Sequence, residues 1–143
     1  MRHAMKAMVF ATTLLSAAVW ADASPVGTWK TIDDKTGQAK SLVQIAEQGG
    51  EFSGKVVKLF QNPEAACDKC EGDRANKPIQ GMTILWGVKK SGDSYEGGKI
   101  FDPKEGKTYS VKFKPIEGGR KLEVRGFLGV ALLGRTQVWE RAE

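Results

Sequence analysis

Strand-like segments separated by glycine-rich turns fill most of this 143-residue chain. In residues 107–114, for example, Tyr109, Val111 and Phe113 alternate with polar residues, as in a strand with one buried face. Eight such segments occur, at residues 26–33, 39–48, 51–60, 82–90, 95–101, 107–114, 121–128 and 132–141. Short turns favour antiparallel neighbours, and closing the sheet removes its exposed edges. The pattern predicts an all-β fold, an eight-stranded antiparallel up-and-down β-barrel; the alternative is a two-sheet sandwich.

The first and last predicted strands carry residues suited to plugging one end of a barrel. Gly27 and Trp29 open the first strand, and Arg135 and Trp139 share one face of the last strand. If that face points inward, the Arg135 guanidinium covers the Trp29 indole through a cation–π contact. Gly27, Trp29, Arg135 and Trp139 are therefore predicted to be structural. The alternative for Arg135 is an interior cation that holds an anionic group of a ligand.

The N-terminus has the pattern of a secretory signal. Arg2 and Lys6 precede a largely apolar stretch, residues 7–19, and small residues follow at Ala21 and Ala23. The predicted organisation is a signal peptide at residues 1–23 and a single β-barrel domain at residues 24–143 of a secreted protein. The alternative is an amphipathic N-terminal helix of a cytosolic protein.

Histidine is almost absent from the chain, and this excludes several kinds of chemistry. The one histidine is His3, inside the predicted signal. Serine–histidine and cysteine–histidine catalysis, zinc–histidine sites and haem held by a proximal histidine are therefore excluded for residues 24–143. No enzyme activity, catalytic residue, metal or cofactor is predicted.

The charge of the chain bears on its partners. Removing residues 1–23 changes the net charge from +5 to +4, and the remaining lysines are scattered along the strands. This pattern predicts no nucleic-acid binding and allows weak contact with an anionic membrane surface. It carries no signal for an oligomeric state.

A long connection, residues 61–80, interrupts the series of short turns and contains both cysteines. Loops of this length are commonly functional or disordered. Cys67 and Cys70 have the spacing of a redox motif but lack its strand–helix context, and no further cysteine is available for a metal. A structural disulfide in an oxidising compartment is predicted; redox and metal-binding roles are the alternatives.

Several motifs together resemble a known family. They are Gly27-Thr28-Trp29, Gly98-Lys99-Ile100-Phe101-Asp102-Pro103, Gly106-Lys107-Thr108-Tyr109, Val124-Arg125-Gly126-Phe127-Leu128-Gly129 and Leu133-Gly134-Arg135-Thr136-Gln137-Val138-Trp139. In this order they are similar to a widespread family of small exported bacterial proteins classed as a domain of unknown function. The resemblance implies a lipocalin-like barrel exported to the periplasm or beyond, with no established reaction or ligand. The lipocalin comparison itself extends to Gly27, Trp29 and Arg135.

Two functions are compatible with such a barrel. The first is the binding of a small apolar or amphiphilic ligand, such as a lipid, inside the barrel in the bacterial envelope. The predicted ligand contacts are Trp86, Tyr109, Phe113, Arg125 and Arg135. Trp86 is included because it shares a predicted inward face with Met82, Ile84 and Val88. The second is a non-enzymatic envelope interaction protein with a packed barrel, acting through its surface or the 61–80 loop. The volume of the interior distinguishes them.

The signal pattern leads to a first prediction. Exported protein is expected to begin at Ser24, because small residues at Ala21 and Ala23 precede strand-like sequence. Intact-mass measurement on protein from the periplasm or medium checks this. Full-length protein in the soluble cytoplasmic fraction would contradict it.

Overall fold

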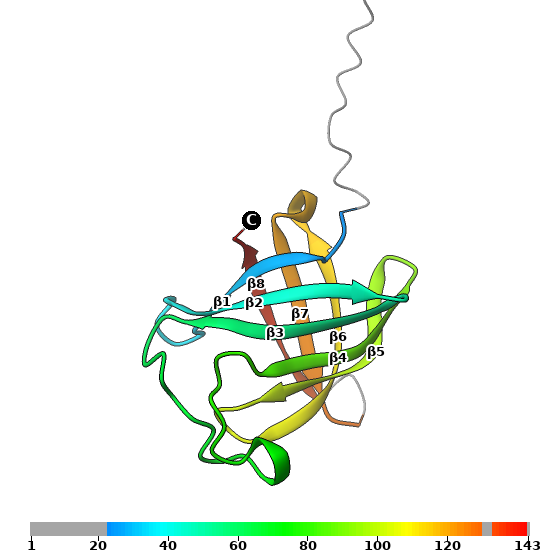
Figure 1. The fold of residues 1–143 in the computed structure, drawn as a ribbon. Helices are drawn as coiled ribbons and strands as arrows, with labels where there is room; N and C mark the ends of the chain where they lie inside the picture. The colour runs from blue at the N-terminus through cyan, green and yellow to red at the C-terminus, as the bar shows by residue number, and fades with distance from the viewer. Residues whose placement is uncertain (1–22, 130–132, 143) are drawn as a thin grey trace, which may run out of the picture.

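The computed structural model describes residues 23–129 and 133–142, and its eight strands form a closed barrel (Figure 1). Each strand pairs antiparallel with the next, and the last pairs with the first, so the predicted up-and-down barrel is confirmed and the sandwich is excluded. The strands are β1 (Gly27–Ile32), β2 (Ala39–Gln48), β3 (Glu51–Leu59), β4 (Thr83–Ser91), β5 (Ser94–Asp102), β6 (Lys107–Ile116), β7 (Lys121–Phe127) and β8 (Gly134–Arg141). Short 3₁₀ turns lie at η2 (Gly72–Arg74) and η3 (Glu117–Gly119).

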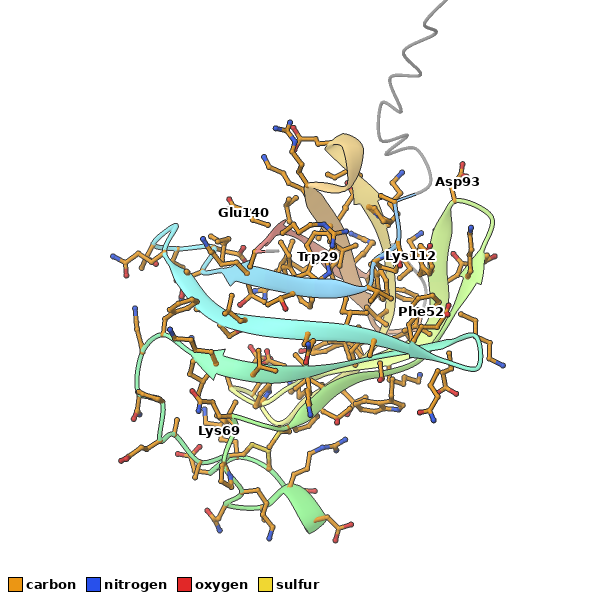
Figure 2. All side chains as sticks on the ribbon, turned by 45° about the horizontal axis from the view of Figure 1, so that its top comes forward. Trp29, Phe52, Lys69, Asp93, Lys112 and Glu140 are labelled. Carbon is orange, nitrogen blue, oxygen red and sulfur yellow. A yellow bond between two sulfur atoms is a disulfide. The ribbon has the colours of Figure 1, made fainter. Side chains whose placement is uncertain are left out.

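The two ends of the barrel differ. The closed end carries the start of β1, the end of β8, the tight β2–β3 and β4–β5 turns, and η3. The open end carries the β1–β2 and β5–β6 turns and the long β3–β4 connection, which lies below the strands in Figure 1. Figure 2 shows Trp29 toward one end and Lys69, in the long connection, at the other.

Aromatic side chains fill the closed half of the barrel. Phe52 meets Tyr95 edge-on with ring centroids 4.9 Å apart, and Tyr95 stacks on Phe113 at 5.5 Å. Trp29 and Leu122 beside them are fully buried. These side chains come from five strands, so their packing ties the wall of the barrel together at this end.

Arg141 plugs the closed end. Its guanidinium lies 4.2 Å from the centre of the Trp29 ring. It also donates to three carbonyl oxygens, those of Gly119, Val26 and Ser24, at 2.6, 3.0 and 2.8 Å. Burial lowers the pKa of Arg141 from its usual value. One cation thus joins β1, β8, η3 and the segment before β1.

The prediction that Arg135 covers Trp29 is therefore wrong. Alternation along β8 puts Arg135 and Arg141 on the same face, but Arg141 is the residue in register with Trp29. Since β1 and β8 run antiparallel, the start of β1 lies beside the end of β8. Arg135 lies six residues earlier, about 20 Å along the strand, at the open end. Gly27 and Trp29 take the predicted places at the start of β1, and Trp139 is buried.

The inward face of β4 also differs from the prediction. Its pairing with β3 shifts register twice, on either side of Gly54, and Gly87 has a positive φ of 72°. The shift brings Leu85 inward, fully buried opposite Gly54 and Ile100. Trp86 pairs with the exposed Lys99 and turns to the outer face. A β-bulge changes the phase of alternation, and the sequence pattern of β4 does not reveal it.

The plug leads to a second prediction. Arg141→Ala is expected to lower the free energy of unfolding by about 2–3 kcal/mol, because it uncovers Trp29 and leaves carbonyl groups without a donor. Arg135→Ala is the matched control on the same strand face, with an expected loss below about 1 kcal/mol. Urea unfolding of both variants measures the difference. Equal losses, or a larger loss for Arg135→Ala, would contradict this account of closure.

Candidate functional site: a cavity at the open end

The open half of the barrel contains a cavity of about 720 Å³. The aromatic layer of Phe52, Tyr95 and Phe113 does not line it, so the cavity ends where that packing begins. Its deeper walls include Val56 and Val124, and its roof includes Ala65 and Ile79 of the long connection. The barrel is therefore filled at one end and hollow at the other.

One wall of the cavity is apolar. It is formed mainly by β3, β4 and β5, whose apolar lining residues are Val56, Leu59, Ile84, Ile100 and Phe101. Gly126 of β7 also lines the cavity, and a Cβ atom there would lie 3.6 Å from both Ile100 and Tyr109, an ordinary contact distance. This wall suits an alkyl chain or a flat ring.

The opposite wall, formed by β1, β2 and β8, carries polar groups. The Thr31 and Ser41 hydroxyls are buried and lie 2.7 Å apart. On β8, the Trp139 indole donates to the Gln137 side-chain oxygen at 3.3 Å. The Gln137 amide nitrogen donates in turn to Asp34 at 3.4 Å. The cavity is thus amphipathic across its width.

The rim of the cavity is charged. Arg135, whose side chain is 67% exposed, pairs with Asp34 at 3.5 Å. Tyr109 donates from its hydroxyl to Glu105 at 3.0 Å. Burial, and then the hydrogen bond to the Glu105 carboxylate, raises the pKa of Tyr109, so it remains a neutral donor at physiological pH. The other charged residues of the lining are Lys40, Lys69, Lys104, Asp68 and Asp102.

The long β3–β4 connection is an ordered roof. Cys67 and Cys70 form the predicted disulfide. The Cys67 amide donates to Lys77 at 2.8 Å, and the Cys67 carbonyl accepts from Asn76 at 2.9 Å. A side chain at Gly106 of the β5–β6 turn would collide with the Lys69 backbone, so roof and turn pack closely.

Arg74 attaches the same roof to β4 and β5. Its guanidinium lies 5.1 Å from the Trp86 ring centre and 4.3 Å from that of Phe101. These cation–π contacts explain why Trp86 is half-buried although it faces outward. Trp86 therefore supports the roof and does not line the cavity.

The five residues predicted to contact a ligand have separate locations. Tyr109 and Arg135 line the cavity. Phe113 points inward but belongs to the packed aromatic layer. Arg125 lies on the outer face of β7, where it donates to Thr136 at 2.9 Å. Since Val124 is buried, alternation turns Arg125 outward. The predicted interior positions of Arg125 and Trp86 are thus corrected.

Sequence reasoning missed the polar wall. Thr31 and Ser41 are small polar residues within strand segments and carry no distinctive spacing. A signal did exist for Gln137, because it alternates with Arg135 and Trp139 on one face of β8. Extended by one more step, the same alternation also places Arg141 on this face of β8.

Two further properties bear on the site. Within residues 23–129 and 133–142, no group of three or more histidine, cysteine or acidic side chains is placed to hold a metal ion. No helix in that part of the chain is long and apolar enough to cross a membrane.

Comparison with known proteins agrees with this architecture. A family model described as "Uncharacterized protein conserved in bacteria (DUF2147)" matches residues 27–141. The chain belongs to the DUF2147 family. The predicted resemblance is thereby confirmed, and the DUF2147 match includes all eight strands. No curated protein matches the chain.

Among solved structures, this DUF2147 chain is similar to one titled "Protein HP1028 from the human pathogen Helicobacter pylori belongs to the lipocalin family". The TM-score is 0.74, the sequence identity is 22%, and the alignment covers 84% of each chain. At this identity the likeness shows a shared lipocalin-like fold. It does not carry a ligand from one protein to the other.

The disulfide leads to a third prediction. Replacing both Cys67 and Cys70 with serine is expected to lower the free energy of unfolding by at most about 2 kcal/mol, because the closed loop is short. Hydrogen exchange should rise in the roof, where the amides of Cys67 and Asn76 are protected, and stay unchanged in β7. Two free thiols in purified wild-type protein under non-reducing conditions would contradict the disulfide itself.

Proposed function

We propose that this protein is an exported, non-enzymatic binding protein that holds one slim amphiphile in the open half of its barrel. The observation that carries the proposal is the cavity of about 720 Å³. This volume lies within the range of about 300–1,000 Å³ typical of small-molecule sites. A packed barrel acting only through its surface would not need such a space, so the cavity favours binding over the alternative function.

The two walls of the cavity suggest the chemistry of the ligand. Val56, Leu59 and Ile100 offer apolar contact on one side, while Thr31, Ser41 and Gln137 offer hydrogen bonds on the other. A molecule that is apolar along one face and polar at one end or edge satisfies both walls. A single acyl chain with a compact head group, or a small aromatic acid or alcohol, has this form.

Three features support a location in the bacterial envelope. Residues 1–23 have the pattern of a cleaved secretory signal. The disulfide between Cys67 and Cys70 fits an oxidising compartment. The family is bacterial. We therefore propose that residues 24–143 form the working domain in the periplasm or outside the cell, where a barrel can carry a lipid-like molecule across water. The basic excess allows weak contact with anionic membranes.

Blocking the cavity gives a fourth prediction. Gly126→Phe is expected to fill the cavity, since Gly126 lines it and a Cβ atom there meets only ordinary contacts. Fatty acids and lysolipids below their critical micelle concentrations should change the fluorescence of wild-type protein, because the buried Trp139 lines the cavity. The change should be lost in Gly126→Phe. The variant Trp86→Phe should retain it, since Trp86 lies outside.

Val138→Phe is the matched control. It adds the same side chain to the exposed outer face of β8, beside Trp139 but pointing away from the cavity, and should leave titrations unchanged. Lipid extraction and native mass spectrometry of protein from its own envelope then identify the bound molecule. Flat titrations of the wild type with every ligand class, together with no copurified molecule, would reject the binding proposal.

A further inference from the structure

The barrel closes through a very short seam. β1 and β8 pair at two positions, Trp29 with Arg141 and Lys30 with Glu140. By comparison, β7 and β8 pair at seven positions. Both strands of the seam continue toward the open end without pairing to each other in the described residues, β1 to Ile32 and β8 back to Gly134. In Figure 1, β8 runs steeply away from β1. The polar wall of the cavity lies along this unpaired part.

Asp34 crosses the seam at the open end. One of its carboxylate oxygens, Oδ2, accepts from Gln137 Nε2 at 3.4 Å and lies 3.5 Å from Arg135 Nη1. The turn that presents Asp34 is well defined, because Asp33 accepts from the Lys35 and Thr36 amides at 2.7 and 3.1 Å. A carboxylate from the β1–β2 turn is thereby held by two side chains of β8.

The two donors on β8 are arranged for a carboxylate. Gln137 Oε1 accepts from the Trp139 indole, so the amide nitrogen of Gln137 is directed toward the mouth. Arg135, two residues earlier, lies on the same strand face and also lines the cavity. Amide and guanidinium donors that converge on one carboxylate oxygen form an anion site.

The hold on Asp34 is weak. The distances from Asp34 to Gln137 and to Arg135 are near the upper limit for hydrogen bonds or longer. The ion pair is also exposed to solvent, with side-chain exposures of 67% for Arg135 and 47% for Asp34. A carboxylate on a ligand whose apolar part is bound in the cavity gains from that contact as well. Such a ligand competes effectively for the same donors.

We propose that Arg135 and Gln137 form the head-group subsite for a carboxylate amphiphile, and that Asp34 occupies this subsite until the ligand displaces it. The inference rests on the proposed binding function and specifies its ligand class. The apolar part of the ligand lies against Val56 and Ile100, and its carboxylate takes the place of Asp34 between the donors. Displacement also removes a contact that holds the β1–β2 turn to β8. Ligand binding therefore frees this turn from β8 at the open end, where β1 and β8 are not paired.

The test compares dodecanoic acid with 1-dodecanol, which has the same chain length and lacks the charge. Asp34→Asn is expected to tighten binding of the acid about two- to fivefold, because it removes the internal competitor. Arg135→Gln should weaken binding of the acid about tenfold. Neither variant should change binding of the alcohol by more than about twofold.

Asp93→Asn is the matched control for charge. It makes the same substitution in the β4–β5 turn, at the closed end, where Figure 2 labels Asp93. It should not change the affinity for either ligand. A second measurement does not depend on the variants. In wild-type protein, the Gln137 side-chain amide resonances should shift on addition of dodecanoic acid and shift much less with 1-dodecanol.

The outcomes separate this inference from the proposed function. If both ligands bind equally and Gly126→Phe blocks both, the cavity binds amphiphiles but the carboxylate subsite is refuted. If Arg135→Gln weakens both ligands alike, or Asp34→Asn does not tighten binding of the acid, the subsite is likewise refuted. If neither ligand binds the wild type and no other amphiphile does, the proposed function fails and the inference fails with it.

Discussion

Closure of the barrel depends on the Arg141 guanidinium over the Trp29 ring. A sheet of eight strands must join its first and last strands, and here two paired positions make that joint. Arg141 reinforces it by stacking on Trp29 and by donating to Ser24, Val26 and Gly119, so β1, β8 and the β6–β7 turn meet at one half-buried cation. A group with several donors and a flat face can satisfy all of these partners at once.

The hollow half of the barrel lies at the end opposite to that joint. β1 and β8 pair at the closed end, and the aromatic packing of Phe52, Tyr95 and Phe113 lies at that same end. Toward the open end the seam is unpaired, and the interior holds a cavity instead of a core. Polar side chains of β1, β2 and β8 line the unpaired side, and apolar side chains of β3, β4 and β5 line the other. The packed aromatic core and the cavity therefore occupy opposite ends of one sheet.

Local features of the chain are visible in its sequence, whereas the register between strands is not. The strands, their order and the Cys67–Cys70 disulfide follow from local alternation, turn residues and cysteine spacing, and the structure confirms them. Alternation predicts that Trp86 faces inward, but register shifts and Gly87 in β4 change the alternation and turn it outward. Alternation shows that Arg135 lies on the inward face of β8, but it does not show the register between β8 and β1, which brings Arg141 to Trp29.

The sequence by itself determined that this chain forms an all-β fold of successive antiparallel strands, since alternating apolar residues and frequent turns leave few other ways to bury one face of each strand. The pairing of β1 with β8 then showed that the sheet closes into a barrel and is not a sandwich. It also determined that residues 24–143 contain no histidine for catalysis or metal binding. Only the tertiary structure decided which arginine plugs the barrel, which half is hollow, and that Asp34 meets Arg135 and Gln137. These depend on contacts between strands about a hundred residues apart, which are set by register and closure and not by local pattern.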